Sequence, residues 1–175
     1  MAFSGWKKPD NKIVVAGSPL VQELKVETAT NMYPGRLVKK GTNDDDIVVC
    51  GASDMPIGWL GYEHTAAPYR PSTVDTAYSA NDRAAVLCGG GFVLVARLAS
   101  GENVSKGDLL VPAANGELKK ASTLQIAEGS TTVTSTAANG DIITGHYGDA
   151  PIVAIAEESV DASSEAKDIM VRSLI

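Results

Sequence analysis

The sequence has few of the residues on which many functional sites depend. Its 175 residues include two cysteines, two histidines and 5% aromatic residues. The two cysteines, Cys50 and Cys88, cannot make a disulfide framework and are typical of a protein made in a reducing compartment. No apolar run approaches the roughly 20 residues that a membrane-spanning helix needs. No secretory signal is visible after the polar N-terminus, so we expect no membrane partner.

Basic residues are also in the minority. Fifteen Lys and Arg stand against 21 Asp and Glu, which gives a net charge of −6. Such a chain repels phosphate backbones, and we therefore expect no nucleic-acid partner. The length is that of one domain.

Short apolar or alternating runs, each bounded by Gly, Pro, Asn or Asp, predict a chain made mostly of strands. Two Asn-Gly pairs, at 115–116 and 139–140, are typical of tight turns with positive φ angles. Helix is expected at most for a turn or two, at Ser159–Asp168 and Ala77–Arg83. The expected fold class is all-β, a small β-barrel or sandwich with long loops and little helix. The predicted strands are Lys12–Ala16, Leu20–Glu27, Arg36–Lys39, Ile47–Cys50, Ile57–Tyr62, Ala84–Leu87, Phe92–Leu98, Asp108–Pro112, Glu117–Ala121, Thr132–Thr136, Ile142–Thr144, Ile152–Ala156 and Lys167–Leu174.

Two parts of the sequence echo one another. Pro34–Lys40 parallels Lys106–Pro112 at an offset of 72 positions, and Asp54–Glu63 parallels Asp149–Glu158 at an offset of 95. The additional residues of the second copy coincide with Ser122–Gly148, which we interpret as an insertion. The echo predicts two related β units, with repeat-like halves at about 33–99 and 104–175. They would form a single β domain over 13–175, preceded by a flexible N-terminal arm over 1–12.

Candidate chemical sites are few, and each has a simpler structural explanation. Cys88–Phe92 is glycine-rich but leads into a strand, so we expect a turn rather than a phosphate-binding loop. Asp44–Asp46 is expected to be a solvated turn rather than a calcium site. Cys50, Cys88, His64 and His146 include no closely spaced ligand pair, so no metal site is expected. We predict no catalytic residues, no cofactor and no enzymatic activity.

Several motifs, in their order along the chain, resemble the family of small phage capsid cement (head decoration) proteins. The resemblance implies a structural protein of the virion, made in the host cytoplasm and bound to the outer surface of an icosahedral head. It also implies a homotrimer at three-fold positions that contacts the major capsid protein. The motifs are Ala29–Val38, Pro56–Gly58, Gly91–Val95, Lys106–Leu110, Asn115–Leu118, Asp149–Ala154 and Ile169–Arg172.

Two sets of residues are candidates for these contacts. In the arm, Phe3 and Trp6 lie next to Lys7 and Lys8, and aromatic anchors on an extended segment are suited to a partner's apolar pocket. A frayed terminus with incidental aromatics is the alternative. Large, contact-prone residues follow in the first unit and are candidates for the trimer interface, although a core role for the tryptophan is equally compatible; these are Trp59, Tyr62, Tyr69 and Arg70.

Two other functions stay open at this point. One is a cytoplasmic β-barrel that acts as a binding or carrier module for a small ligand or a partner protein. Val104–Ala121 resembles the hairpins of lipoyl and biotinyl carrier domains, but the turn at Asn115-Gly116 lacks the lysine that those domains modify. The other is a hydrolase with a metal site built from the histidines and acidic residues.

Overall fold

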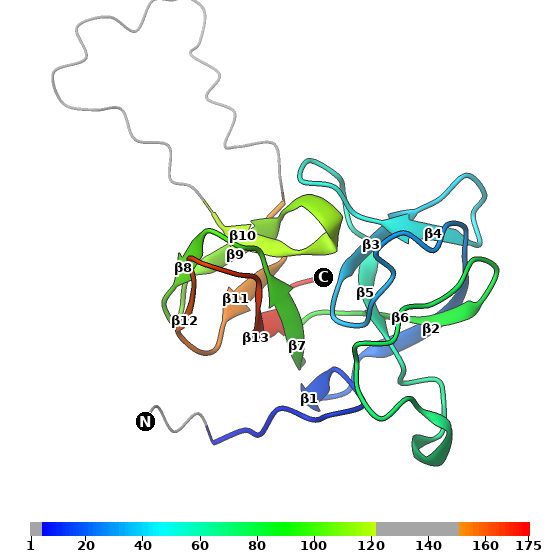
Figure 1. Cartoon of the computed structure of the whole chain (residues 1–175), viewed down its shortest axis with the longest axis horizontal. Helices are drawn as coiled ribbons and strands as arrows, with labels where there is room; N and C mark the ends of the chain where they lie inside the picture. Colours follow the sequence, from blue (N-terminus) through cyan, green and yellow to red (C-terminus); the bar gives the residue numbers. More distant parts are fainter. Residues whose placement is uncertain (1–4, 122–150) are drawn as a thin grey trace, which may run out of the picture.

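The computed structural model describes residues 5–121 and 151–175, and these residues form two five-stranded β-barrels that lie side by side (Figure 1). The chain is all-β with little helix, as predicted. The strands predicted at Thr132–Thr136 and Ile142–Thr144, the Asn-Gly pair at 139–140 and most of the predicted insertion lie outside the described residues.

Barrel one is built from residues 20–88, and its strands close in the order β2-β4-β3-β5-β6. Alternate residues of each strand point inward, because successive side chains of a strand lie on opposite faces. Leu24 and Val26 of the first strand lie inside, packed with Ile47, Leu60 and Val86. The strands are β2 (Leu20–Val26), β3 (Leu37–Lys40), β4 (Asp46–Val49), β5 (Gly58–Gly61) and β6 (Arg83–Cys88).

Barrel two is built from residues 93–173 and closes in the order β7-β10-β9-β11-β13, because β13 pairs with β7 as well as with β11. A two-stranded ribbon of β8 and β12 lies beside it. The strands are β7 (Val93–Leu98), β8 (Glu102–Val104), β9 (Leu109–Pro112), β10 (Leu118–Lys120), β11 (Ala154–Ala156), β12 (Val160–Ala162) and β13 (Lys167–Ser173).

The two barrels have the same connectivity. In each, the first strand pairs in parallel with the third strand and antiparallel with the last, while the other pairs are antiparallel. The two echoed sequence segments lead into β3 and β9, and into β5 and β11. The predicted halves were misplaced, however. Strand β7 (93–98) was assigned to the first half but belongs to barrel two, and β2 precedes the predicted start of the first half.

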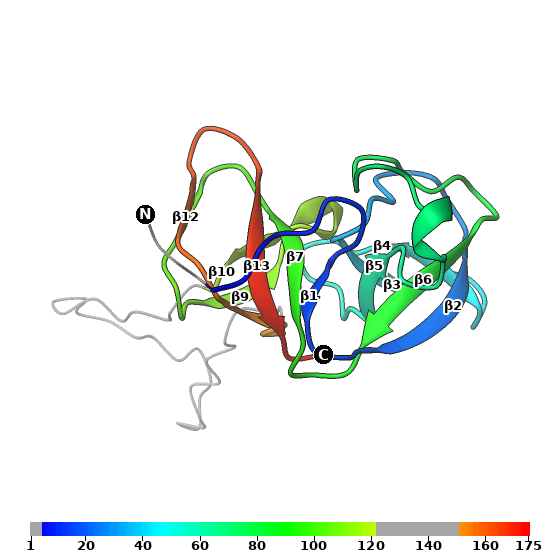
Figure 2. The ribbon, with the colours of Figure 1, turned by 90° about the horizontal axis from the view of Figure 1, so that it is seen from below.

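Strand β1 (Val14–Ala16) precedes barrel one in the sequence but pairs antiparallel with β7 of barrel two. Figure 2 shows β1 lying beside β7, with the connection to β2 leading across to the other barrel. Residues 89–92 make a second crossing, from β6 to β7. The chain therefore passes between the barrels twice.

The hydrophobic core extends through both barrels. One cluster fills barrel one, and a second cluster fills barrel two and continues onto the outer face of barrel one, where it includes Leu37, Trp59 and Leu87. All four residues of β5 are buried, because this strand has the interior of its own barrel on one side and the second barrel on the other.

Both helix expectations were wrong. Ser159–Asp168 contains β12 and the start of β13, and Ala77–Arg83 is a turn with Asn81 at a φ of 70° that leads into β6. The helical segments of the described residues are two short 3₁₀ turns, Ala67–Tyr69 and Ala114–Gly116. Asn115 and Gly116 have positive φ angles, as predicted, and connect β9 to β10.

Candidate functional site

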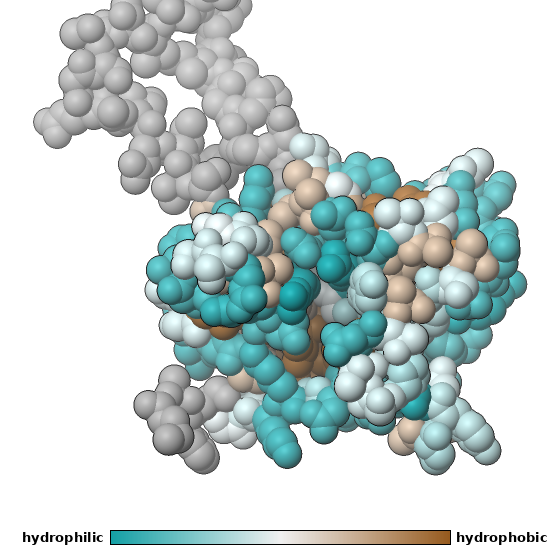
Figure 3. Space-filling view, in the orientation of Figure 1, coloured by the Kyte–Doolittle hydropathy of each residue, from teal (hydrophilic) through white to brown (hydrophobic). Residues whose placement is uncertain are grey.

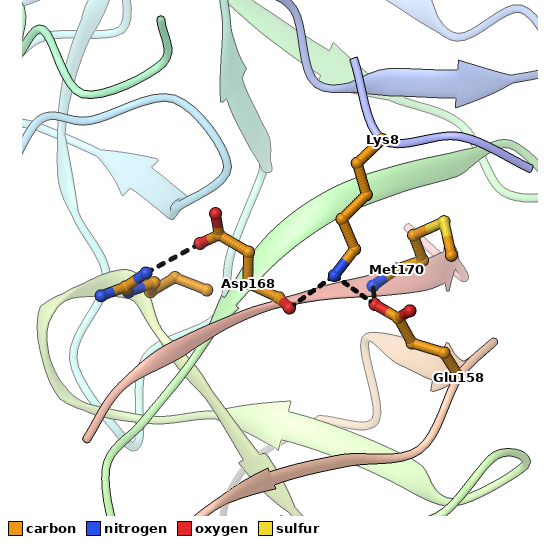
Figure 4. A network of polar contacts seen from close by, with 5 residues as sticks. Lys8, Glu158, Asp168 and Met170 are labelled. Atoms are coloured by element: carbon orange, nitrogen blue, oxygen red, sulfur yellow. Dashed lines mark hydrogen bonds and ion pairs between the residues drawn. The ribbon is translucent and has the colours of Figure 1, made fainter. Parts of the chain in front are cut away.

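The N-terminal segment is attached to barrel two through Lys8 (Figure 4). Its Nζ donates a 2.8 Å hydrogen bond to the carbonyl oxygen of Asp168 and lies 2.5 Å from Oε1 of Glu158. The same Glu158 oxygen accepts a 2.8 Å hydrogen bond from the amide of Met170. Strand β11 pairs with β13 only as far as Val171. Lys8 and Glu158 therefore satisfy the backbone of β13 just beyond the point where its neighbouring strand ends.

This attachment changes the predicted arm. Lys8 is bonded to barrel two, so the predicted flexible arm over 1–12 is attached to the rest of the chain within its C-terminal part. Trp6 is 42% exposed and Lys7 is exposed, whereas Phe3 lies outside the described residues. Two of the four predicted capsid-binding residues, Trp6 and Lys7, therefore lie at the surface and precede the attachment point at Lys8.

Glu63, in the loop after β5, fixes β1 between the barrels. Its Oε1 accepts 2.9 Å hydrogen bonds from the amides of both Ile13 and Val14, and the carbonyl of Ile13 accepts a 2.8 Å bond from the amide of Val95 in β7. Sequence reasoning missed Glu63, because its partners lie about 50 positions away. The short strand β1 is therefore tied to both barrels.

A cavity of about 220 Å³ lies between the barrels, next to β1. Figure 3 shows an opening between the two barrels with hydrophobic residues at its floor. Two guanidinium groups line the cavity, and each is already paired with a carboxylate. Arg97 lies 2.9 Å from Asp168, and Arg36 lies 3.3 Å from Glu117. The cavity is therefore close to charge balance and is not an evident site for an anion.

Arg36 connects the loop before β3 to the turn between β9 and β10. Its Nη1 donates a 2.7 Å hydrogen bond to the carbonyl of Asn115, and its guanidinium lies over the ring of Tyr33 at 5.3 Å from the centroid. Burial lowers the pKa of Arg36, with Glu117 acting in the opposite direction. These contacts give Arg36 a structural role in holding the barrels together.

The four residues predicted for the trimer interface lie in different environments. Trp59 is fully buried and Tyr62 is 4% exposed, so both are core residues and the interface prediction was wrong for them. The Arg70 guanidinium donates to the carbonyls of Tyr62 and Thr65, which fixes the loop between β5 and β6. Tyr69, at 82% exposed, is available to a partner.

The acidic run Asp44–Asp46 is only partly the solvated turn that was predicted. Asp46 is buried, and its carboxylate lies 2.7 Å from Lys25 Nζ and accepts a 2.6 Å hydrogen bond from Asn43. The hydrogen bond from Lys25, followed by that from Asn43, lowers the pKa of Asp46. This carboxylate thus joins β2 to β4 through its ion pair with Lys25.

Within residues 5–121 and 151–175, no three His, Cys, Asp or Glu side chains gather closely enough to hold a metal ion. Cys50 is buried, and its desolvation raises the pKa of the thiol to about 12. Cys88 is the last residue of β6, and the glycine-rich residues after it connect β6 to β7, where the sequence predicted a turn between strands. No helix in the described part of the chain is long and apolar enough to cross a bilayer.

Comparison with known proteins identifies the class of protein. The family model of the XM1 gp53 minor capsid protein matches residues 7–170, which include barrel one, barrel two as far as the first part of β13, and the attachment point at Lys8. The match defines a capsid-associated phage protein, as the resemblance implied. The chain belongs to the XM1 gp53 minor capsid protein family and has a structural role in the capsid.

Among solved structures, the chain is similar to the head fiber gp8.5 N base of bacteriophage phi29. The identity is 11% and the TM-score 0.48, over 89% of this chain and 94% of that one. The comparison with curated proteins gave no match.

Proposed function

We propose that this capsid protein is a non-enzymatic decoration, or cement, protein. It binds the outer surface of an icosahedral phage head as a homotrimer at three-fold positions, where it contacts the major capsid protein and stabilises neighbouring capsomers. The observation that carries the proposal is the minor capsid family match, because it extends from residue 7 to residue 170 and so includes barrel one and barrel two as far as the first part of β13.

The charge of the chain supports a position outside the shell. A net charge of −6 disfavours binding to packaged DNA. The two closed barrels leave few free strand edges, and closure limits uncontrolled edge-to-edge association at high local density on a shell. Repetition over symmetric sites then gives avidity from individually weak contacts.

The proposed capsid contact is the N-terminal segment ahead of Lys8. Phe3 and Trp6 would enter an apolar pocket of the major capsid protein, and Lys7 would pair with an acidic group at its rim. Lys8 holds this segment at a fixed point on barrel two. The proposed trimer contact uses Tyr69, which is exposed on a loop that Arg70 fixes from within.

Cosedimentation with empty heads that lack this protein tests the capsid contact. Deletion of residues 1–7 should weaken binding at least tenfold, because it removes both aromatic anchors while the Lys8 contacts remain. A full-length variant, Lys8→Met, is the matched control for loss of the attachment alone. Binding by the truncated chain at the wild-type level would contradict the proposed role of this segment.

Light scattering tests the trimer. The purified chain should have the mass of three copies, and Tyr69→Ser should shift it toward the monomer while Tyr69→Phe should not. Because Tyr69 is exposed, neither substitution should change the melting temperature by more than a degree or two. A monomeric wild-type protein at micromolar concentration would contradict the trimer.

A further inference from the structure

Because the two barrels have the same connectivity, the edges of their corresponding strands can be compared. The edges of the two first strands differ. Strands β2 and β7 are the first strands of the two barrels, and an offset of 72 residues aligns them. At this offset, Glu27 and Ala99 occupy the same position, and each donates its amide to the third strand of its barrel, to the carbonyls of Ile47 and Leu118. Glu23 is then the counterpart of Val95.

In barrel two, the edge of β7 that faces the third strand is paired along most of its length. The third strand, β10, pairs with β7 only at Leu98. Farther along the same edge, β1 takes over, with Val14 opposite Leu94 and the Val95 amide bonded to the Ile13 carbonyl. A short extended segment of small and β-branched residues is therefore the natural occupant of this edge.

In barrel one, the corresponding edge is open. The third strand, β4, pairs with β2 only at Lys25 and Val26. Even-numbered residues of β2 direct their backbone groups toward β6, because Val26 bonds to the carbonyl of Asp82. The backbone N–H and C=O groups of Val21 and Glu23, which are odd-numbered, consequently point away from β6. No residue in the described part of the chain pairs with them there.

The exposure of the two strands shows the same difference. Val21 is 48% exposed, whereas its counterpart Val93 is 5% exposed; Leu20 is 71% exposed, whereas Phe92 is 2% exposed. Apolar side chains next to unpaired backbone groups are the features of an edge that binds another strand.

We propose that the β2 edge at Val21–Glu23 accepts an extended strand of the major capsid protein, paired antiparallel as β1 pairs with β7. The proposal rests on the proposed capsid-binding function and names a second contact, distinct from the N-terminal segment. The donated strand would resemble Val14–Ala16 in carrying small and β-branched residues, and one of its carbonyls would accept the amide proton of Glu23. A second copy of this chain is a poorer donor, because its own β1 is bound to β7 and Glu63.

A single substitution at Glu23 tests the proposed backbone hydrogen bond. Glu23→Pro removes one of the two amide protons, those of Val21 and Glu23, that face the donated strand, while the pairing of β2 with β6 uses Gln22 and Leu24 and is retained. Glu23→Ala is the matched control, because it keeps the amide and removes only the side chain. In cosedimentation with empty heads that lack this protein, Glu23→Pro should bind at least tenfold more weakly than Glu23→Ala, with both variants folded by circular dichroism.

If the proline variant does not fold, a second pair of variants, at Val21, tests whether this edge binds the heads. Val21→Lys places a charge on the edge and should weaken head binding similarly, whereas Val21→Thr keeps a β-branched residue and should bind like the wild type. Wild-type binding by a folded Glu23→Pro, or by Val21→Lys, would overturn the proposal.

The outcomes separate this proposal from the proposed function. If the wild-type chain binds heads and the edge variants bind equally well, the edge proposal fails and the decoration function stands. If the wild-type chain does not bind heads, both fail. If Glu23→Pro leaves head binding intact but dissociates an oligomer in light scattering, the occupant is a second copy, which also overturns the assignment to the capsid protein.

Discussion

The indole Nε1 of Trp59 donates a 3.0 Å hydrogen bond to Oγ of Ser173, 114 positions away. Trp59 is in β5 of barrel one, and Ser173 is the last residue of β13 in barrel two. Both are fully buried, and the Ser173 hydroxyl in turn donates to the carbonyl of Ile175. The large aromatic residue that sequence reasoning considered for contacts between chains thus joins the two barrels within one chain.

Ser173→Ala should destabilise the protein by about 1–3 kcal/mol, because it leaves the indole N–H of Trp59 buried without an acceptor. Urea unfolding followed by tryptophan fluorescence measures the change in the free energy of unfolding. Ser164→Ala is the control, since Ser164 is exposed and should change stability by less than about 0.5 kcal/mol. Equal effects of the two substitutions would show that the buried hydrogen bond contributes little.

Gly35 and Gly107 are counterparts in the two units and make a matched pair of tests. Both have a positive φ, 82° and 93°, so alanine at either position should cost about 1–2 kcal/mol in backbone strain. A Cβ on Gly35 would also lie 2.8 Å from the carbonyl oxygen of Val95, whereas one on Gly107 would meet nothing within 4 Å. Gly35→Ala should therefore be the more destabilising by about 1–3 kcal/mol.

Thermal or urea unfolding of the two glycine variants gives this difference directly. The excess cost at Gly35 reports on the contact between the barrels, because the strain of the left-handed backbone is common to both sites. A Gly107→Ala variant as unstable as Gly35→Ala would contradict this contact as the cause.

Glu63→Ala should release β1 from barrel one. The substitution removes the carboxylate oxygen that accepts from the amides of Ile13 and Val14, and hydrogen bonds to a charged group contribute about 1.5–3 kcal/mol. Hydrogen exchange at these two amides should accelerate at least tenfold. Glu63→Gln retains an acceptor oxygen and should show a smaller effect, whereas equal protection in all three proteins would exclude Glu63 as the anchor.

Asp46 should make barrel one sensitive to acid. Its carboxylate has a lowered pKa in the folded protein, first because of the hydrogen bond from Lys25. The unfolded chain therefore takes up the proton at a higher pH than the folded chain does. The stabilisation is present above the ordinary Asp value of about 4 and is lost as the pH falls through the folded pKa.

Urea unfolding between pH 6 and pH 3 tests this prediction. The Asp46→Asn variant should be less stable at neutral pH and should lose less stability on acidification than the wild type. Asp45→Asn, which changes an exposed neighbour, should follow the wild-type curve. Parallel curves for Asp46→Asn and the wild type would contradict the role of this carboxylate.

Sequence could predict those parts of the fold that are recorded in local patterns. The Pro-Gly and Lys-Gly starts of the echoed segments mark the turns before β3 and β9, and their glycines share a positive φ. The sequences of β2 and β7, by contrast, share no pattern that would have shown these two strands to be equivalent. One strand is exposed at four consecutive positions and the other is covered by β1, so their side chains differ although their backbones correspond.

The candidate site was less predictable, because its contacts are distant in the sequence. Lys8 bonds to a carbonyl 160 positions away, and no local spacing of charges indicates such a partner. Tyr62 was considered for an interface because of its size, but it directly follows β5 and packs in the hydrophobic cluster of barrel one, with its ring centroid 5.3 Å from that of Tyr78. Tyr69, which was considered for the same reason, lies on a loop outside the barrels and is exposed.

The placement of β1 sets a constraint on how the protein is made. During synthesis, barrel one has all five of its strands once Cys88 has left the ribosome, and it can close from then on. Strand β1 has no strand to pair with until Val93–Leu98 has followed, although it is synthesised before barrel one. Until the second barrel begins to form, β1 therefore lacks a paired strand and is held to barrel one by the Glu63 carboxylate, through the amides of Ile13 and Val14.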